Sequence, residues 1–151
     1  MDRSEDSTPV ADHVLLAESL GLLEPVAGEV VSSFYEQLFV EFPEVRPMFP
    51  ADMSGQPEKL LKAIIALVTH YERPEALLPA LTAMGRRHAD YGVRIDHYSA
   101  VGLTLLATLR RFAADAWTPA YEGAWLRAYT FTAGVMMQAG AVERVPAAAA
   151  A

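Results

Sequence analysis

The chain has 151 residues, of which 52% are hydrophobic and 21% charged, and a domain of this size buries enough apolar surface for a stable core without crosslinks. That composition excludes a disordered chain, and the absence of cysteine excludes disulfides, thiolate zinc sites and a cysteine nucleophile. The net charge of −7, with no dense run of lysine or arginine, argues against nucleic acid as a partner.

The first ten residues are polar and partly acidic, unlike a signal peptide, which needs a basic start and an apolar core. The longest strongly apolar run, Ala63 to Val68, is far shorter than the ~20 residues of a membrane span. We therefore expect a soluble cytoplasmic domain with no membrane partner.

Apolar residues recur at helical spacing almost throughout. The first predicted helix covers residues 10–20 and ends at Gly21, and the second follows Pro25. The second helix carries an apolar stripe made of Val31, Phe34, Tyr35, Leu38, Phe39 and Phe42. A short turn bracketed by Pro43 and Pro47 ends at Met48-Phe49.

Residues 50–55 are predicted to form a loop, with Ser54 as the cap of the next helix. One face of that helix carries Gln56, Leu60, Ile64, Leu67 and Tyr71. After Arg73-Pro74, a further helix is predicted to stop near Gly92. Its apolar stripe is formed by Leu77, Leu81 and Met84, and it continues into His88.

Asp96 is predicted to cap the following helix, which runs through Val101 to Phe112. Thr118 is predicted to cap the last helix and Pro119 to begin it, and this helix runs toward Gly140. We find no internal repeat and no β-hairpin. The sequence thus predicts an all-α domain of six to eight helices over residues 10–144, with flexible segments at 1–9 and at the alanine-rich 145–151.

The sequence contains no nucleotide-binding, metalloprotease or serine-hydrolase motif. Its histidines, at positions 13, 70, 88 and 97, are too far apart for a two-histidine metal pair on one helix. His88 extends an apolar stripe, so it is either a buried neutral histidine bonded to a backbone carbonyl or the single ligand of a cofactor metal. Tyr35 and Gln56 lie on other helices with Phe49 between them, and this set favours a flat apolar cofactor held between helices.

Several motifs in order now point to a family. They are FYEQLFVEFPEVRPMFP (34–50), Gln56-Pro57, GRRHADYGVRIDHYSAVG (85–102), DAWTP (115–119) and AWLRAY (124–129). Together they resemble the haem domain of flavohaemoglobins and the related single-domain bacterial haemoglobins, over roughly residues 10 to 140. The resemblance implies a globin fold, a three-over-three helical sandwich around haem b.

The resemblance assigns roles to individual residues. His88 matches the proximal iron ligand, and His97 is its only serious competitor. Tyr35 and Gln56 match the distal tyrosine and glutamine, which are the candidate catalytic residues. The other candidate haem contacts are Phe49, Lys59, Leu60, Met84, Arg87, Val93, Tyr98, Val101 and Tyr129, among which Lys59 and Arg87 would meet the propionates.

Two departures from the family pattern bear on activity. Gly140 stands where the family has a glutamate that polarises the ligand histidine, which implies a weaker electron donor to iron unless Glu143 replaces it. The chain also ends at Ala151, whereas flavohaemoglobins continue into FAD and NAD(P)H domains. We therefore expect any turnover to need a separate flavin-type reductase.

The resemblance implies reversible binding of O2, and also of NO and CO, by a monomer or homodimer. The leading function is nitric oxide dioxygenation with that reductase. The alternatives are haem-dependent oxidation of a small molecule in secondary metabolism, gas sensing through a partner, and a helical interaction domain without cofactor.

Overall fold

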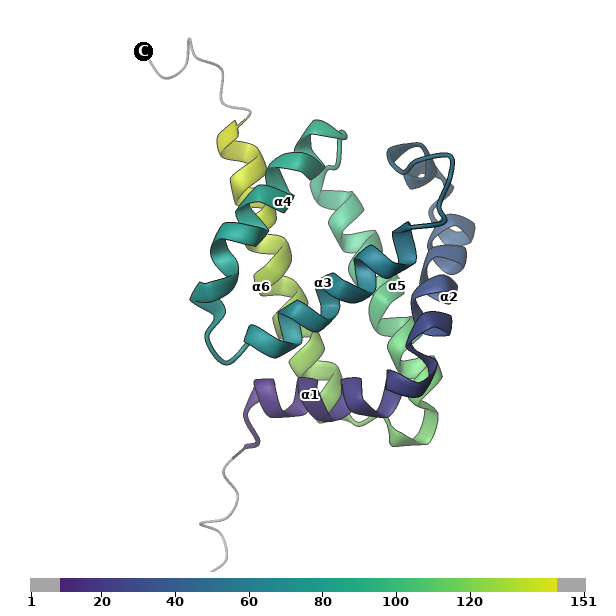
Figure 1. Ribbon diagram of the computed structural model, residues 1–151, viewed down its shortest axis with the longest axis vertical. Coiled ribbons are helices and arrows are strands. Elements are labelled where there is room, and N and C mark those ends of the chain that lie inside the picture. The colour runs from purple at the N-terminus through teal and green to yellow at the C-terminus, as the bar shows by residue number, and fades with distance from the viewer. Residues whose placement is uncertain (1–8, 144–151) are drawn as a thin grey trace, which may run out of the picture.

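The computed structural model describes residues 9–143, which form six α-helices joined by short 3-10 turns (Figure 1). The helices are α1 (Asp12–Leu23), α2 (Ala27–Glu41), α3 (Gln56–His70), α4 (Leu78–Asp90), α5 (Ile95–Ala113) and α6 (Pro119–Glu143). The turns are η2 (Glu24–Val26), η3 (Pro43–Met48), η4 (Pro74–Leu77) and η5 (Ala114–Ala116). No strand occurs within the described range, so the predicted all-α class is confirmed. The terminal segments predicted at 1–9 and 145–151 lie outside this range, except for Pro9.

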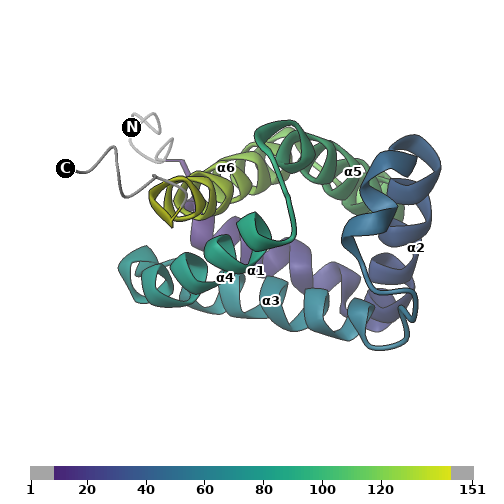
Figure 2. The ribbon, with the colours of Figure 1, turned by 90° about the horizontal axis from the view of Figure 1, so that it is seen from above.

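The helices form two layers. Figure 2 shows α5 and α6 along one side of the molecule, α3 and α4 along the other, and α2 at one end. Helix α2 packs on α3 and α5, helix α1 packs on α6, α3 and α5, and α4 packs mainly on α6. This is the arrangement expected for a three-over-three sandwich.

The core is divided into two clusters. The larger joins α1, α2, α3, α5 and the first half of α6, and its most buried large side chains are Leu16, Phe34, Leu38, Leu109 and Trp125. The smaller joins η4 and α4 to the second half of α6 through Leu77, Leu81 and Met136. Helix α4 is therefore attached to the rest chiefly through α6.

Three predicted helix ends are wrong. Gly21 lies inside α1, because a glycine ends a helix only where its backbone turns left-handed, and among the described glycines only Gly92 does so. Helix α1 instead stops at Leu23, just ahead of Pro25. Ser54 does not cap α3. Its N–H donates to Asp52 Oδ1 at 3.0 Å, and Gly55 occupies the cap position.

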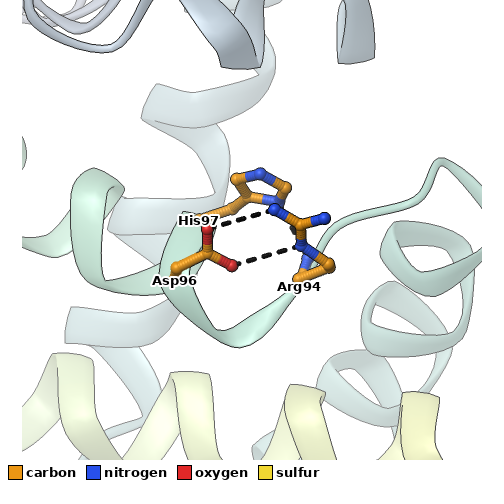
Figure 3. Close-up of polar contacts among 3 residues, drawn as sticks. All are labelled: Arg94, Asp96 and His97. Carbon is orange, nitrogen blue, oxygen red and sulfur yellow. Dashed lines mark hydrogen bonds and ion pairs between the residues drawn. The ribbon is translucent and has the colours of Figure 1, made fainter.

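The cap of α5 also differs from the prediction. Arg94 is the cap residue, and its N–H donates to Nδ1 of His97 at 2.9 Å (Figure 3). Asp96 lies in the first helical turn, where its carboxylate accepts from the Arg94 guanidinium at 3.3 Å. Because the His97 side chain accepts the hydrogen bond from the Arg94 N–H, the start of α5 is capped without the Asp96 side chain. The cap of α6 is as predicted, since Tyr121 N–H donates to Thr118 Oγ1 at 3.1 Å.

Candidate functional site

Tyr35 lies on α2 inside a cluster of aromatic rings. Its side chain is only 7% exposed, and its ring centroid lies 5.0 Å from that of Phe34, 6.0 Å from that of Phe39 and 5.6 Å from that of Phe49. Burial raises the pKa of the Tyr35 hydroxyl, and a hydrogen bond with the Gln56 side chain acts in the opposite direction. The structure thus brings the predicted distal pair, Tyr35 and Gln56, together with Phe49, a predicted haem contact.

Arg46 holds the backbone next to this cluster. Its guanidinium donates to the carbonyls of Phe49, Pro50 and Ala51 at 3.3, 2.9 and 3.1 Å, and it lies 5.1 Å from the Phe39 ring centroid. The Arg46 side chain therefore fixes the backbone of residues 49–51, which leads from η3 toward Gln56. Sequence reasoning missed Arg46. The available signal was a cation between two prolines, just ahead of a loop whose carbonyls need donors.

His88 lies on α4, and its two ring nitrogens have different surroundings. Nδ1 lies 2.7 Å from the carbonyl oxygen of Met84, which can only accept, so Nδ1 carries the proton and Nε2 keeps a free electron pair. Burial lowers the pKa of His88, the Met84 bond opposes that shift, and the charge of Arg87 adds to it. A neutral imidazole with a free Nε2 suits a single axial metal ligand.

The connection from α4 to α5 is built around His88. Gly92 has φ +85°, a left-handed conformation that glycine adopts without strain, and this turn lets Val93 N–H donate to the His88 carbonyl at 3.0 Å. The ring of Tyr98, at the start of α5, stacks on the His88 ring at 26° with 6.2 Å between centroids. His97 faces the Arg94 backbone instead, with one ring nitrogen already engaged (Figure 3).

Tyr129 links α6 to this side of the site. Its hydroxyl donates to the Tyr98 carbonyl at 2.5 Å, and its ring fills the place where a side chain at Gly102 would stand, 2.6 Å from the position of a Cβ. Burial raises the pKa of Tyr129. The hydroxyl is thus committed to the α5 backbone, and a contact of the Tyr129 ring with haem stays a prediction.

The other residues predicted to contact haem fall into two groups, half-buried apolar side chains and exposed cationic ones. The apolar ones are half-buried, as expected for side chains facing a cofactor that would complete their burial: Phe49, Leu60, Met84, Val93 and Val101. Lys59 on α3 and Arg87 on α4 are exposed. No group of three or more potential metal-binding side chains occurs among the described residues.

Gly140 is buried where α6 crosses α4. A Cβ there would lie 3.0 Å from the Ala89 Cβ and 3.2 Å from the Gly85 carbonyl oxygen, so the close approach of the helices favours glycine. A cavity of about 240 Å³ adjoins this crossing. It is lined by Gly85, Ala89, Gly92, Val93, Arg94, Ile95, Tyr98, Met136, Met137, Gly140 and Ala141. The side chain of Glu143, the predicted substitute for the family glutamate, lies outside the described residues.

The profile of one family, Globin, matches residues 32–136. The chain belongs to the globin family. Globins bind haem, and the neutral His88, the polar pair Tyr35 and Gln56 and the half-buried apolar side chains fit that group.

The relatives of this globin include flavohemoproteins. That of Vibrio cholerae is 32% identical over 130 residues, covering 83% of this chain and 33% of its own length. That of Rhodopirellula baltica is 33% identical over 126 residues, covering 82% and 31%. The globin thus spans about a third of the length of these relatives.

Solved structures agree on the fold. A bacterial globin from Campylobacter jejuni superposes with a TM-score of 0.77 at 24% identity, covering 87% of this chain and 96% of its own. An engineered carbene transferase, based on a protein of Rhodothermus marinus described as a putative nitric oxide dioxygenase, gives a TM-score of 0.79 at 26% identity, covering 90% and 96%. The predicted three-over-three globin fold is confirmed. No described helix is long and apolar enough to cross a membrane.

Proposed function

We propose that this globin binds haem b through Nε2 of His88 and binds O2, NO and CO reversibly on the side of Tyr35 and Gln56. The observation that carries the proposal is the state of His88. Its Nδ1–H is occupied by the Met84 carbonyl, and burial keeps the ring neutral, so Nε2 is left as a ligand. His97 is a poorer candidate because its ring is buried in the cap of α5.

The haem contacts follow from the same residues. Phe49, Leu60, Met84, Val93 and Val101 would bury the macrocycle, and the exposed Lys59 and Arg87 would meet its propionates. When bound, haem supplies an iron atom that takes a diatomic gas as ligand. Tyr98 would hold the His88 ring in its orientation by stacking.

On the opposite side, the Tyr35 hydroxyl and the Gln56 amide are hydrogen-bond donors for bound gas. A net hydrogen bond contributes ~0.5–1.5 kcal/mol, more toward a charged acceptor, and ~1.4 kcal/mol is a tenfold change in a rate or an equilibrium. Two donors would therefore slow O2 release by about one to three orders of magnitude. Such retention favours chemistry on the bound gas over delivery of it.

The reaction we propose is nitric oxide dioxygenation. Nitric oxide and O2 combine to give nitrate, with one electron taken from a separate flavin-type reductase. Support comes from the flavohemoprotein relatives and from the Rhodothermus marinus protein. The Nδ1–H of His88 donates to a backbone carbonyl, and residue 140 is a glycine rather than a glutamate. A carbonyl polarises the imidazole less than a carboxylate would, so we expect His88 to donate less electron density to iron and through it to a bound ligand.

Ultraviolet–visible spectra of purified protein test the haem assignment. The wild type should show a Soret band that shifts on reduction and again with CO, and His88→Ala should lose most of the bound haem. His97→Ala is the matched control and should retain it. Loss of haem in His97→Ala, with a wild-type spectrum in His88→Ala, would overturn the assignment.

The reaction has its own test. Reduced, O2-loaded protein mixed with one equivalent of nitric oxide should give nitrate in equal amount, and a flavin reductase with NADH should make it catalytic. Haem binding with no nitrate formed would leave a gas-binding globin and would contradict dioxygenation.

A further inference from the structure

A cavity lies where α4, the start of α5 and the end of α6 meet. Its volume is about 240 Å³, and it adjoins the close approach of Gly140 to Gly85. Five of its eleven lining residues are glycine or alanine, and two of these, Gly92 and Ala141, are exposed. The small side chains leave space between the helices, and the exposed residues give this space an open side.

The cavity is separate from the predicted gas-binding side. Tyr35, Gln56 and His88 are not among its lining residues. Of the residues predicted to contact haem, only Val93 and Tyr98 also line the cavity. These two residues therefore form the boundary between the cavity and the predicted haem site.

The lining of the cavity is almost entirely apolar. Arg94 and Tyr98 have the only polar side chains among the lining residues, and the Arg94 side chain is 72% exposed and paired with Asp96 at 3.3 Å. No carboxylate from the described part of the chain lines the cavity. Because an unpaired charge is costly to bury, a neutral and largely apolar molecule fits this space better than an ion.

Two methionines favour an aromatic ring as that molecule. Met136 and Met137 line the cavity from consecutive positions on α6. A thioether adapts its shape to its neighbour and makes favourable contacts with the edge of an aromatic ring. A closed apolar cavity of about 150 Å³ can hold benzene, so the volume here admits one ring with a small substituent.

The hydroxyl of Tyr98 offers a hydrogen bond to such a molecule. Tyr98 is half-buried, its ring stacks on that of His88, and its backbone carbonyl accepts from the Tyr129 hydroxyl. Burial raises the pKa of the Tyr98 hydroxyl, and no hydrogen bond with another described residue acts on that pKa. The hydroxyl is therefore a donor from which an oxygen atom of a ligand can accept.

We propose that this cavity binds a small, neutral aromatic molecule that carries one oxygen atom. The ring of the ligand packs against Met136 and Met137, and its oxygen accepts a hydrogen bond from Tyr98. A single ring of about seven non-hydrogen atoms should bind with a dissociation constant of about 0.1–5 mM. Phenol has this size and chemistry and is the probe for the site.

Tyr98 connects the cavity to the predicted haem site. Its ring centroid lies 6.2 Å from that of His88, and the two rings are inclined by 26°. A ligand that engages the Tyr98 hydroxyl restrains the ring that stacks on His88, so occupancy of the cavity should alter the haem spectrum. This coupling rests on the proposed function, whereas binding of the aromatic molecule does not require haem.

Calorimetric titration of the purified protein with phenol tests the cavity. The wild type should bind one equivalent, and Ala141→Phe, which places a ring at the open side, should weaken binding at least tenfold. Gln138→Phe is the matched control, because residue 138 is exposed on the same helix but does not line the cavity. Both positions are exposed, so both variants should keep the wild-type melting temperature. Equal binding by the two variants, or no saturable binding by the wild type up to about 20 mM phenol, would overturn the proposal.

Toluene isolates the contribution of the hydrogen bond, because it has the size of phenol but a methyl group in place of the hydroxyl. Tyr98→Phe should weaken phenol binding about two- to tenfold, which corresponds to one hydrogen bond, and should leave toluene binding unchanged. Equal changes in the affinity for the two probes would contradict the hydrogen bond from Tyr98.

Absorption spectra recorded during the phenol titration distinguish failure of the cavity site from failure of the proposed function. A Soret change that saturates with the calorimetric dissociation constant, and is absent in Ala141→Phe, would support the coupling through Tyr98. Phenol binding that leaves the Soret band unchanged would contradict that coupling. Phenol binding by a protein that retains no haem would contradict the proposed function and support the cavity site. A Soret change that persists in Ala141→Phe would place phenol on the haem side and overturn the proposal.

Discussion

At the scale of single residues, the two distal donors differ in how firmly they are held. Tyr35 is fixed by three aromatic neighbours and is almost fully buried. Gln56 is half-buried at the first position of α3, beside Gly55, and its side chain has more freedom to lose. Arg46 fixes the loop backbone at Phe49, Pro50 and Ala51, several residues ahead of Gln56.

Tyr35→Phe should therefore speed O2 dissociation by about tenfold or more, the loss of one well-oriented hydrogen bond. Gln56→Leu should have a smaller effect, and CO, a weaker hydrogen-bond acceptor than O2, should respond less to either change. Stopped-flow release of O2 from both variants measures this. A larger effect of Gln56→Leu would mean that Gln56 is the better-ordered donor.

Family motifs in the sequence identified candidate site residues, whose roles toward haem stay predictions, but they missed residues whose role depends on backbone atoms. His88, Tyr35, Phe49 and Gln56 came from motif matches, and the last three do gather on one side. Arg46 was not predicted, because its function is to satisfy carbonyls whose positions only the fold defines. The hydrogen bond from the Tyr129 hydroxyl could not be predicted for the same reason, since its acceptor is the backbone carbonyl of Tyr98.

At the scale of elements, the junction between α5 and η5 contains backbone strain. Ala114 has φ +50° and ψ −122°, a conformation that disfavours any residue with a Cβ. Ala114→Gly should raise the free energy of unfolding by about 1 kcal/mol, even after the entropy cost of glycine. Chemical denaturation measures the change. Ala107→Gly, on the exposed face of α5, is the control and should lose about 1 kcal/mol.

Replacing a glycine by alanine should have opposite effects on stability at Gly85, where α4 crosses α6, and at Gly134 on α6. A Cβ at Gly85 would lie 2.3 Å from the Met136 carbonyl oxygen, whereas one at Gly134 would have nothing within 4 Å. Gly85→Ala should thus cost about 1–3 kcal/mol by forcing the helices apart, and it should also loosen haem retention by displacing His88. Gly134→Ala should gain about 0.5–1 kcal/mol from helix propensity. Equal changes in melting temperature for Gly85→Ala and Gly134→Ala would contradict such a close approach of α4 and α6 at Gly85.

Helix interiors were easier to predict than helix ends. Apolar periodicity located all six helices, because it reflects the burial that stabilises each of them. The ends of α1, α3 and α5 were wrong because the fold, and not the local sequence, decides which of several neighbouring residues ends a helix. Asp96 and His97 both lie near the start of α5, and only the fold decides that the histidine reaches the Arg94 N–H.

At the scale of the whole molecule, the first and last helices are joined by a bidentate ion pair. Arg127 on α6 donates from Nε and Nη2 to the two carboxylate oxygens of Asp12 on α1, at 2.8 and 2.9 Å. This contact joins α1 to α6 across more than a hundred residues of chain. It supplements a buried link between the same helices, in which Trp125 Nε1–H donates to Ser19 Oγ at 2.8 Å.

The ion pair predicts a pH dependence of stability. The hydrogen bond from Arg127 lowers the pKa of Asp12 below its usual value near 3.8, so the carboxylate is favoured by folding. The stabilisation is fully present above the unfolded pKa of about 3.9 and is lost as the pH falls through the folded pKa. Asp12→Asn should lower the melting temperature at pH 7 by no more than about 3 °C, because both side chains are partly solvated.

Thermal melts from pH 7 to pH 3 should show wild type and Asp12→Asn converging at the acid end. At pH 7 the difference should shrink in high salt, which screens exposed charges. Asp115→Asn, an exposed acid in η5, controls for the general loss of one negative charge from a chain of net charge −7. A difference between wild type and Asp12→Asn that persists unchanged at pH 3 would show that Asp12 acts through helix capping or packing at the start of α1, and not through its charge.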